Sequence, residues 1–173
     1  EGLRILYITP LRAMSRDLQQ ALSAPLAQLN ESIRVESRTG DTPSHVKQRQ
    51  LRKPPQILMT TPESLCLMLS YPTAQRTFEQ LDSVIVDEWH ELMPNKRGTQ
   101  TELALARLRR WRPSLQVWGL SATLGQPQQA MDQLVGPGGH LIQAQLEREI
   151  QLRMVAPDNL LDLPWAGHYG LSQ

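Results

Sequence analysis

Cysteine, phenylalanine and long apolar runs are scarce or absent in this chain of 173 residues. The single cysteine, Cys66, cannot form a disulfide within the chain, which favours a reduced, intracellular protein. No apolar run approaches the ~18 residues that a membrane-spanning helix needs, so we expect no membrane partner. Neither sign of charge prevails, because 18 Lys and Arg residues stand against 17 Asp and Glu residues and the net charge is +1. Any surface that binds a polyanion must therefore be local.

What is present has the composition of a globular domain, with 40% hydrophobic and 20% charged residues. Apolar runs alternate along the chain with segments of helical periodicity. This alternation predicts an α/β fold with a mostly parallel sheet and helices on both faces. The expected strands cover residues 3–8, 33–37, 56–60, 84–86, 116–120 and 150–155. The expected helices cover residues 18–29, 44–51, 62–69, 99–111 and 126–134.

Local signals refine several of these elements. Pro25 should kink or break the first helix. Thr42 should cap the second helix, with Pro43 at its first position, and residues 61–63 should cap the third. The β-branched run 84–86 predicts a strand that is buried on both faces.

Compact polar clusters follow four of the predicted strands. They are Thr9-Pro10-Leu11-Arg12, Thr60-Thr61-Pro62-Glu63, Asp87-Glu88-Trp89-His90 and Ser121-Ala122-Thr123. Ligands of parallel α/β sheets bind just beyond the carboxyl ends of the strands. We therefore expect these clusters to lie together at one edge of the sheet and to carry the chemistry.

The strongest chemical signal is the pair Asp87-Glu88, which is followed closely by His90. A carboxylate held after a buried strand is a natural ligand, direct or through water, for Mg²⁺ on a nucleotide. The neighbouring Glu88 could orient and deprotonate an attacking water. Two acids also suit a helix N-terminus, because they interact favourably with the helix dipole. The apolar strand before the pair and the histidine after it favour the nucleotide site.

The clusters resemble the motifs of a known enzyme family. Residues 87–90 resemble motif II of DEXH-box superfamily-two helicases, and the other clusters match their motifs in chain order. Residues 9–14 resemble motif Ia, residues 60–65 motif Ib and residues 121–123 motif III, while residues 39–42 resemble the strand-contact loop between Ia and Ib. The segments 39–42, 89–92, 96–98 and 163–168 are similar to the Lhr (large helicase-related) group, and within it to the bacterial DNA-ligase-associated branch.

The resemblance implies a role for individual residues. Asp87 would hold the Mg²⁺ of bound ATP, Glu88 would activate the hydrolytic water, and His90 would sense the γ-phosphate and couple it to Ser121 and Thr123. The remaining motifs would grip the sugar-phosphate backbone of one nucleic-acid strand. The residues concerned are Pro10, Leu11, Arg12, Gly40, Asp41, Thr61 and Glu63. Such contacts do not read bases, so binding should be independent of sequence and weakened by salt.

The chain departs from the family pattern at one point, because no Gly-x-x-x-x-Gly-Lys-Ser/Thr motif occurs in it. The glycines at 136–139 lack the Lys and Ser/Thr and are typical of a helix C-cap. We therefore expect a partial first RecA-like domain over residues 1–155, a three-layer domain that begins after the P-loop and lacks the P-loop strand. Residues 156–173 would form a connector toward a second RecA-like domain. The missing strand should leave an unpaired sheet edge near Val117.

By resemblance, the parent protein is an ATP-dependent DNA helicase that moves 3′→5′ on single-stranded DNA. We expect ATP and Mg²⁺ as cofactors and a role in DNA repair. The expected nucleic-acid partner is single-stranded DNA or a duplex with a single-stranded tail. A DNA ligase or a nuclease would be a protein partner. The expected location is the bacterial cytoplasm, at the nucleoid when DNA is bound. This chain alone should be inactive, because the P-loop and second domain lie outside it.

Other functions stay open at this point. The chain could be a catalytically inactive module that binds nucleic acid, or RNA could replace DNA as the substrate. A serine hydrolase with Gly119-Leu120-Ser121 is disfavoured, because a nucleophile elbow needs glycine where Thr123 stands.

Overall fold

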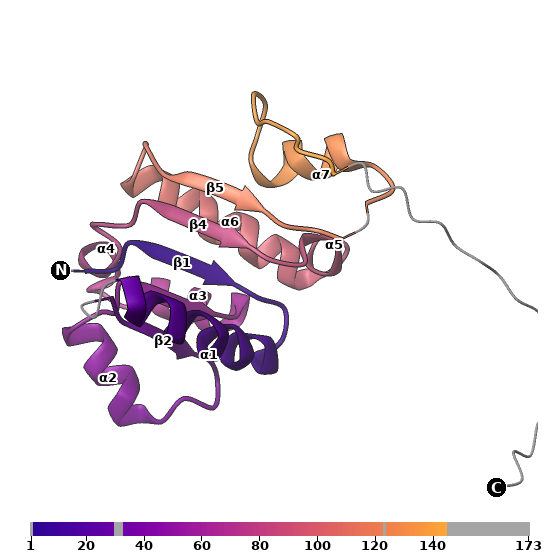
Figure 1. Cartoon of the computed structure of the whole chain (residues 1–173). Coiled ribbons are helices and arrows are strands. Elements are labelled where there is room, and N and C mark those ends of the chain that lie inside the picture. The colour runs from indigo at the N-terminus through magenta and orange to yellow at the C-terminus, as the bar shows by residue number, and fades with distance from the viewer. Residues whose placement is uncertain (1, 30–32, 123, 145–173) are drawn as a thin grey trace, which may run out of the picture. The chain divides into compact units, whose positions relative to one another are not determined.

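The computed structural model describes residues 2–29, 33–122 and 124–144. The chain divides into two units, residues 1–141 and residues 142–173, and the first contains every element described here (Figure 1). The predicted strand at 150–155 and the predicted domain boundary at residue 155 lie outside the described residues.

Five short strands form one sheet in which every described pairing is parallel. They are β1 (Ile5–Ile8), β2 (Val35–Arg38), β3 (Ile57–Thr60), β4 (Ser83–Val86) and β5 (Gln116–Gly119). Their order in the sheet is β2-β3-β1-β4-β5. The five predicted strands that fall on described residues are confirmed, and β5 forms an edge of the sheet as expected.

Seven helices are assigned in the described part of the chain. They are α1 (Arg12–Leu29), α2 (Ser44–Arg52), α3 (Pro62–Leu69), α4 (Ala74–Thr77), α5 (Trp89–Leu92), α6 (Lys96–Trp111) and α7 (Pro127–Leu134). The short helices α4 and α5 were not predicted. Helix α6 begins three residues earlier than expected, because the side chain of Asn95 accepts a hydrogen bond from the backbone N–H of Arg97 and caps the helix there.

Two local predictions are wrong in detail. Helix α1 runs through Pro25 without a break. Proline has no N–H, so Pro25 cannot donate to the carbonyl of Ala21, four residues earlier in the helix. Both residues are exposed, and water can therefore satisfy that carbonyl. The hydroxyl of Thr42 does not cap α2, whose N-cap position is Pro43. It accepts a hydrogen bond from the backbone N–H of Thr39 instead, at 2.9 Å, and so closes the preceding loop.

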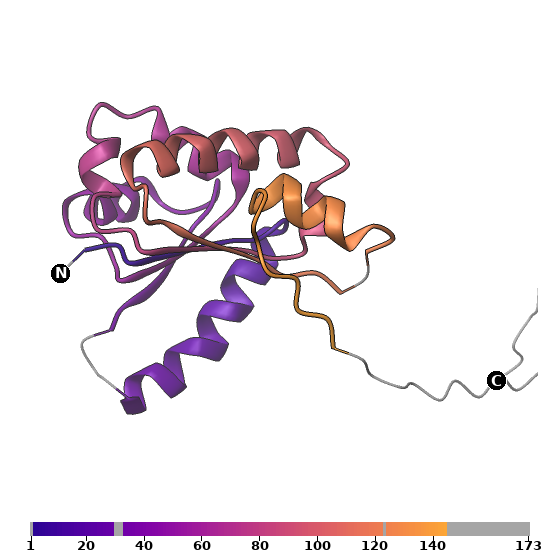
Figure 2. The same cartoon turned by 90° about the horizontal axis from the view of Figure 1, so that it is seen from above.

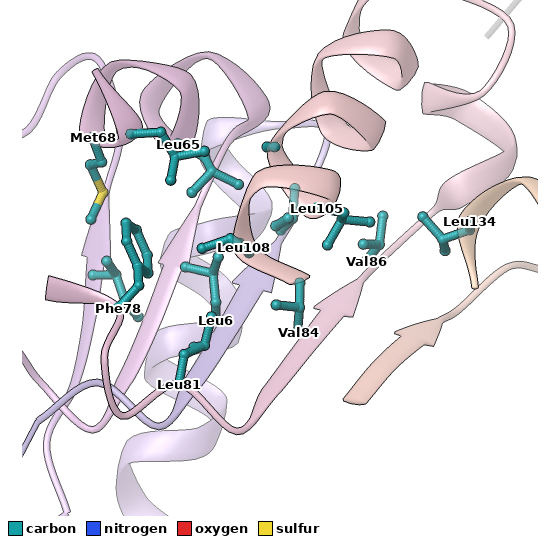
Figure 3. Packing of buried hydrophobic residues seen from close by; sticks show 14 of the residues in the cluster. Leu6, Leu65, Met68, Phe78, Leu81, Val84, Val86, Leu105, Leu108 and Leu134 are labelled. Atoms are coloured by element: carbon teal, nitrogen blue, oxygen red, sulfur yellow. The ribbon is translucent and has the colours of Figure 1, made fainter. Parts of the chain in front are cut away.

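Helices cover both faces of the sheet, as predicted, but unequally. Helices α3 and α6 lie on one face, and α1 lies on the other, over β2 and β3 (Figure 2). Figure 3 shows the core between the sheet and α6, where Val84 and Val86 of β4 face Leu105 and Leu108. Helix α7 packs beside β5 and adds Leu134 to this cluster.

The prediction that β4 is buried on both faces is wrong. Val84 and Val86 are fully buried, whereas Ile85 on the opposite face is only partly buried. The reason is the position of α1, which packs mainly against β2 and β3. Trp118 of β5 is consequently 52% exposed. Among the described helices, none is both long and apolar enough to span a bilayer.

Candidate functional site at the carboxyl edge of the sheet

The carboxyl ends of the strands bring the predicted clusters to one edge of the sheet. Ile8 of β1 pairs in register with Thr60 of β3 and with Val86 of β4, and Val86 pairs with Gly119 of β5. The ladder continues one residue further, because the backbone N–H of Asp87 donates to the carbonyl of Ile8 at 2.9 Å. The prediction that four clusters share one edge is confirmed for their described residues. Thr123 lies outside those residues.

The carboxylate of Asp87 is held by two hydrogen bonds. Its Oδ2 accepts from the hydroxyl of Tyr7 at 3.0 Å, and its Oδ1 accepts from the backbone N–H of Glu88 at 2.9 Å. Partial burial and the negative charge of Asp87 raise the pKa of Tyr7, so the phenol remains a proton donor. Sequence reasoning missed Tyr7, because its closeness to Asp87 depends on the pairing of β1 with β4, in which Tyr7 lies opposite Ile85.

Glu88 occupies an unusual backbone conformation. Its φ of 48° and ψ of 46° are left-handed, and no other non-glycine residue in the described ranges has a positive φ. Such a conformation costs roughly 1–2 kcal/mol and persists where the surroundings enforce it. Trp89 supplies that enforcement, because its backbone N–H donates to Leu120 and its buried indole donates to the carbonyl of Ala130. The strained turn thus aims the side chain of Glu88 away from the core.

His90 joins the acid pair to the end of β5. Its Nδ1 hydrogen-bonds the hydroxyl of Ser121 at 2.9 Å and lies 3.4 Å from Oε2 of Glu88. The three side chains come from two strand ends that are 31 residues apart in the sequence. The structure therefore places His90, from the segment predicted as motif II, in contact with Ser121, from the segment predicted as motif III.

A cleft of about 680 Å³ opens at the same edge of the sheet, between residues that follow β1 and β3 and the start of α6. Six of the seven residues predicted to bind a nucleic-acid strand line it, and they are Pro10, Leu11, Arg12, Gly40, Thr61 and Glu63. The seventh, Asp41, binds Arg12, since Nη1 of the arginine donates to its Oδ1 at 2.7 Å. The structure thus brings the whole predicted set together.

The loop around Gly40 is tied to two cations. The side chain of Lys47 donates to the carbonyl of Gly40 at 2.9 Å. A Cβ on Gly40 would lie only 3.2 Å from Nη2 of Arg12, so the glycine allows the guanidinium to lie close against the loop. Arg12 is exposed, with 59% of its side chain accessible, and is therefore placed to meet a phosphate.

Arg97 also lines the cleft, and sequence reasoning had used it only within the segment 96–98 that resembles the Lhr group. Its Nε donates to Oε1 of Glu63 at 2.6 Å, and its Nη2 donates to the carbonyl of Pro10. Partial burial acts to raise the pKa of Glu63. Hydrogen bonds with its own backbone N–H, with Arg97 and with Thr61, together with the positive charge of Arg97, outweigh the effect of burial. They hold the pKa of Glu63 below its usual value.

Known proteins resemble this chain in sequence and structure. A model of the family "DEAD/DEAH box helicase" matches residues 1–131. The ATP-dependent helicase Lhr-Core of Methanocaldococcus jannaschii is 39% identical over 165 residues, which cover 88% of this chain and 19% of that protein. The Lhr helicase/uracil glycosylase of Escherichia coli is 38% identical over 169 residues, which cover 89% of this chain and 11% of that protein.

Among solved structures, the helicase Lhr of Mycobacterium smegmatis bound to ssDNA and AMP-PNP superposes with a TM-score of 0.72 at 37% identity. The match covers 79% of this chain and 19% of that one. The predicted RecA-like fold is confirmed by this likeness and by the all-parallel sheet. The chain spans less than a fifth of the length of each of these three relatives.

Proposed function

The chain belongs to the DEAD/DEAH box helicase family, and we propose that its parent protein is an ATP-dependent DNA helicase of the Lhr type. In this proposal the chain forms most of the first RecA-like domain of the motor. The observation that carries it is the position of His90, which contacts both Glu88 and Ser121 beside a cleft lined by the strand-binding residues.

The acid pair fits a site for Mg²⁺ on bound ATP. Mg²⁺ keeps several waters and usually takes one or two carboxylates together with substrate phosphates. Within the described ranges no group of three or more His, Cys, Asp and Glu side chains could hold a metal alone. We assign Asp87 as the protein ligand. The bound ion would neutralise charge that develops on the transferred phosphoryl group.

Glu88 is the proposed general base. Its carboxylate is partly exposed and lies 3.4 Å from Nδ1 of His90, and it would accept a proton from the attacking water. His90 would sense the γ-phosphate and transmit its presence to Ser121, and Thr123 would share that role. The phosphate-binding loop and a second RecA-like domain are proposed for parts of the parent protein outside these 173 residues.

The cleft is proposed to bind the backbone of one DNA strand. Its groups are a guanidinium, backbone amides and a helix start with Thr61 as N-cap, all of which suit phosphate and none of which reads a base. The solved relative bound to ssDNA supports DNA over RNA.

Several finer expectations rest on family resemblance alone and are carried forward as proposals. They are 3′→5′ polarity, a role in DNA repair, a ligase or nuclease partner, and a cytoplasmic location at the nucleoid. Unwinding of duplexes with a 3′ tail compared with a 5′ tail tests the polarity.

The test of the function is ATP hydrolysis by the full-length parent protein, with and without single-stranded DNA, beside its Glu88→Gln variant. We expect DNA to stimulate turnover and the variant to lose about 10²–10⁴-fold while still binding ATP. Glu91→Gln is the matched control, because Glu91 lies on the same short helix and is exposed. Hydrolysis that is absent while DNA still binds would identify an inactive binding module. Near-normal turnover of Glu88→Gln would remove Glu88 as the base.

A further inference from the structure

One guanidinium joins a loop and a helix start that both line the cleft. Arg97 is the second residue of α6, and its Nε donates to Oε1 of Glu63 at 2.6 Å, with Nη2 3.4 Å from Oε2. The same Nη2 donates to the carbonyl of Pro10, which lies between β1 and α1. Glu63 is 34 residues away from Arg97 in the chain and Pro10 is 87 residues away. Arg97 therefore connects the first turn of α3, which follows β3, to the loop that follows β1.

The backbone of Arg97 is itself held in place by hydrogen bonds within and next to α6. Its backbone N–H donates to Oδ1 of Asn95 at 2.9 Å, and its carbonyl accepts from the buried hydroxyl of Thr101 at 2.8 Å. The next residue, Gly98, lies against the backbone of Leu92, the last residue of α5. Because α5 also carries His90, Arg97 lies at the junction between the nucleotide side of the site and the strand cleft.

The charge of Glu63 makes this contact important for binding. A carboxylate in a cleft for a phosphate backbone repels the ligand unless a cation neutralises it. The side chain of Glu63 is 53% exposed in that cleft, while that of Arg97 is only 30% exposed. Two of the donors of Arg97 are already used within the protein, so its placement suits holding Glu63 more than contacting a phosphate.

We infer that Arg97 is a positioning residue of the strand site: it neutralises Glu63, holds the Pro10 loop, and acts on DNA binding through these groups rather than by touching the DNA. This inference rests on the proposed function. It assigns to Arg97 a role that the resemblance of the motifs did not give it, and it makes Glu63 a group whose charge must be cancelled.

The experiment measures the affinity of the full-length protein for fluorescent oligothymidine over a range of salt concentrations. The variants are Arg97→Ala, Arg97→Lys, Glu63→Gln and the double variant Arg97→Ala/Glu63→Gln. Arg110→Ala is the matched control, because Arg110 is an exposed arginine at the far end of the same helix. ATP hydrolysis without DNA is also measured for every protein, as a check that the motor domain remains folded.

We expect Arg97→Ala to weaken oligothymidine binding about tenfold, the scale of a partly exposed charge-assisted contact. Removal of the Glu63 charge should rescue most of the loss, so that Arg97→Ala costs no more than about threefold in the Glu63→Gln background. Arg97→Lys should rescue part of it, because lysine keeps the charge but cannot bridge both acceptors. Arg110→Ala should bind as the wild type does, and its DNA-independent hydrolysis should stay within about twofold of the wild-type rate.

Three outcomes would overturn the inference. The same loss in both Glu63 backgrounds would mean that Arg97 contacts phosphate directly, and an unchanged affinity of Arg97→Ala would mean that the contact is dispensable. A parallel fall in DNA-independent hydrolysis would indicate general damage to the fold. These results leave the proposed function intact. A wild-type protein that binds no oligothymidine would overturn the function and the inference together.

Discussion

Replacing Gly98 with alanine tests how closely the two halves of the site are joined. A Cβ at this position would lie 2.5 Å from the carbonyl oxygen of Leu92, and 3.0 Å from both its carbonyl carbon and the Cα of Met93. Favourable C···O contacts begin near ~3.3 Å, so the first distance is too short by about 0.8 Å. All three neighbours are backbone atoms and cannot rotate away. The turn between α5 and α6 must therefore open.

Two opposing effects determine the free energy of the change. Alanine is favoured over glycine in a helix by about 1 kcal/mol, and less than this applies in the first turn of α6. Overpacking a closely packed site costs about 1–3 kcal/mol. We expect a net local destabilisation of about 1 kcal/mol, which corresponds to roughly a fivefold loss of protection in the two helices. Because α5 carries His90, DNA-stimulated hydrolysis should fall as well.

Hydrogen exchange followed by mass spectrometry, on the full-length protein, is the appropriate assay. Peptides from residues 89–105 should exchange faster in Gly98→Ala, and peptides from β1 and β3 should not change. Gly125→Ala is the control, because no atom lies within 4 Å of the position of its Cβ and its φ is not left-handed. Equal or greater protection of α5 and α6 in Gly98→Ala would refute the reasoning, since the helix preference would then outweigh the contact.

Three further substitutions test individual contacts of the site. Tyr7→Phe removes one hydrogen bond to Asp87 and should raise the Mg²⁺ concentration that half-saturates ATP hydrolysis by about 2–10-fold; an unchanged or lower value would show that the hydroxyl does not orient the carboxylate. Ser121→Ala removes the contact with His90 and should reduce unwinding per ATP hydrolysed, measured with a tailed duplex, by about 2–10-fold. Equal falls in unwinding and hydrolysis would contradict that coupling role. Arg12→Ala should weaken binding to all single-stranded sequences alike and lower the salt slope by about 1, and a sequence-selective loss would argue against a phosphate contact.

The elements of the fold were largely predictable because their signals are local. Short apolar runs mark β1, β3 and β4, and Thr61 with Pro62 marks the start of α3, where the structure has the N-cap and first turn. Interactions within a few residues decide such features. The errors at Pro25 and Thr42 show the limit of this reasoning. Solvent around Pro25 allows the helix to continue, and the hydroxyl of Thr42 binds the preceding loop instead of capping α2.

The edge on which the site lies also follows from the chain alone. Strands that alternate with helices must run parallel, and parallel strands present their carboxyl ends, with the polar residues that follow them, at one edge. The order of elements along the chain is therefore sufficient to group Asp87, Ser121 and Arg12. Their roles came from the resemblance of the motifs, which depends on residue type and spacing.

Only packing over long sequence distances decided the rest. The bond from Tyr7 to Asp87 spans 80 residues, and the bond from Arg97 to Pro10 spans 87. Neither has a sequence signal of its own, because each depends on the register of neighbouring strands or on the fit of α6 against the loops. The left-handed turn at Glu88 is of the same kind, since it persists only because Trp89 is held in the core. Short-range preferences of the amino acids specify the elements and the edge, whereas the atoms that meet there are specified by how the elements pack.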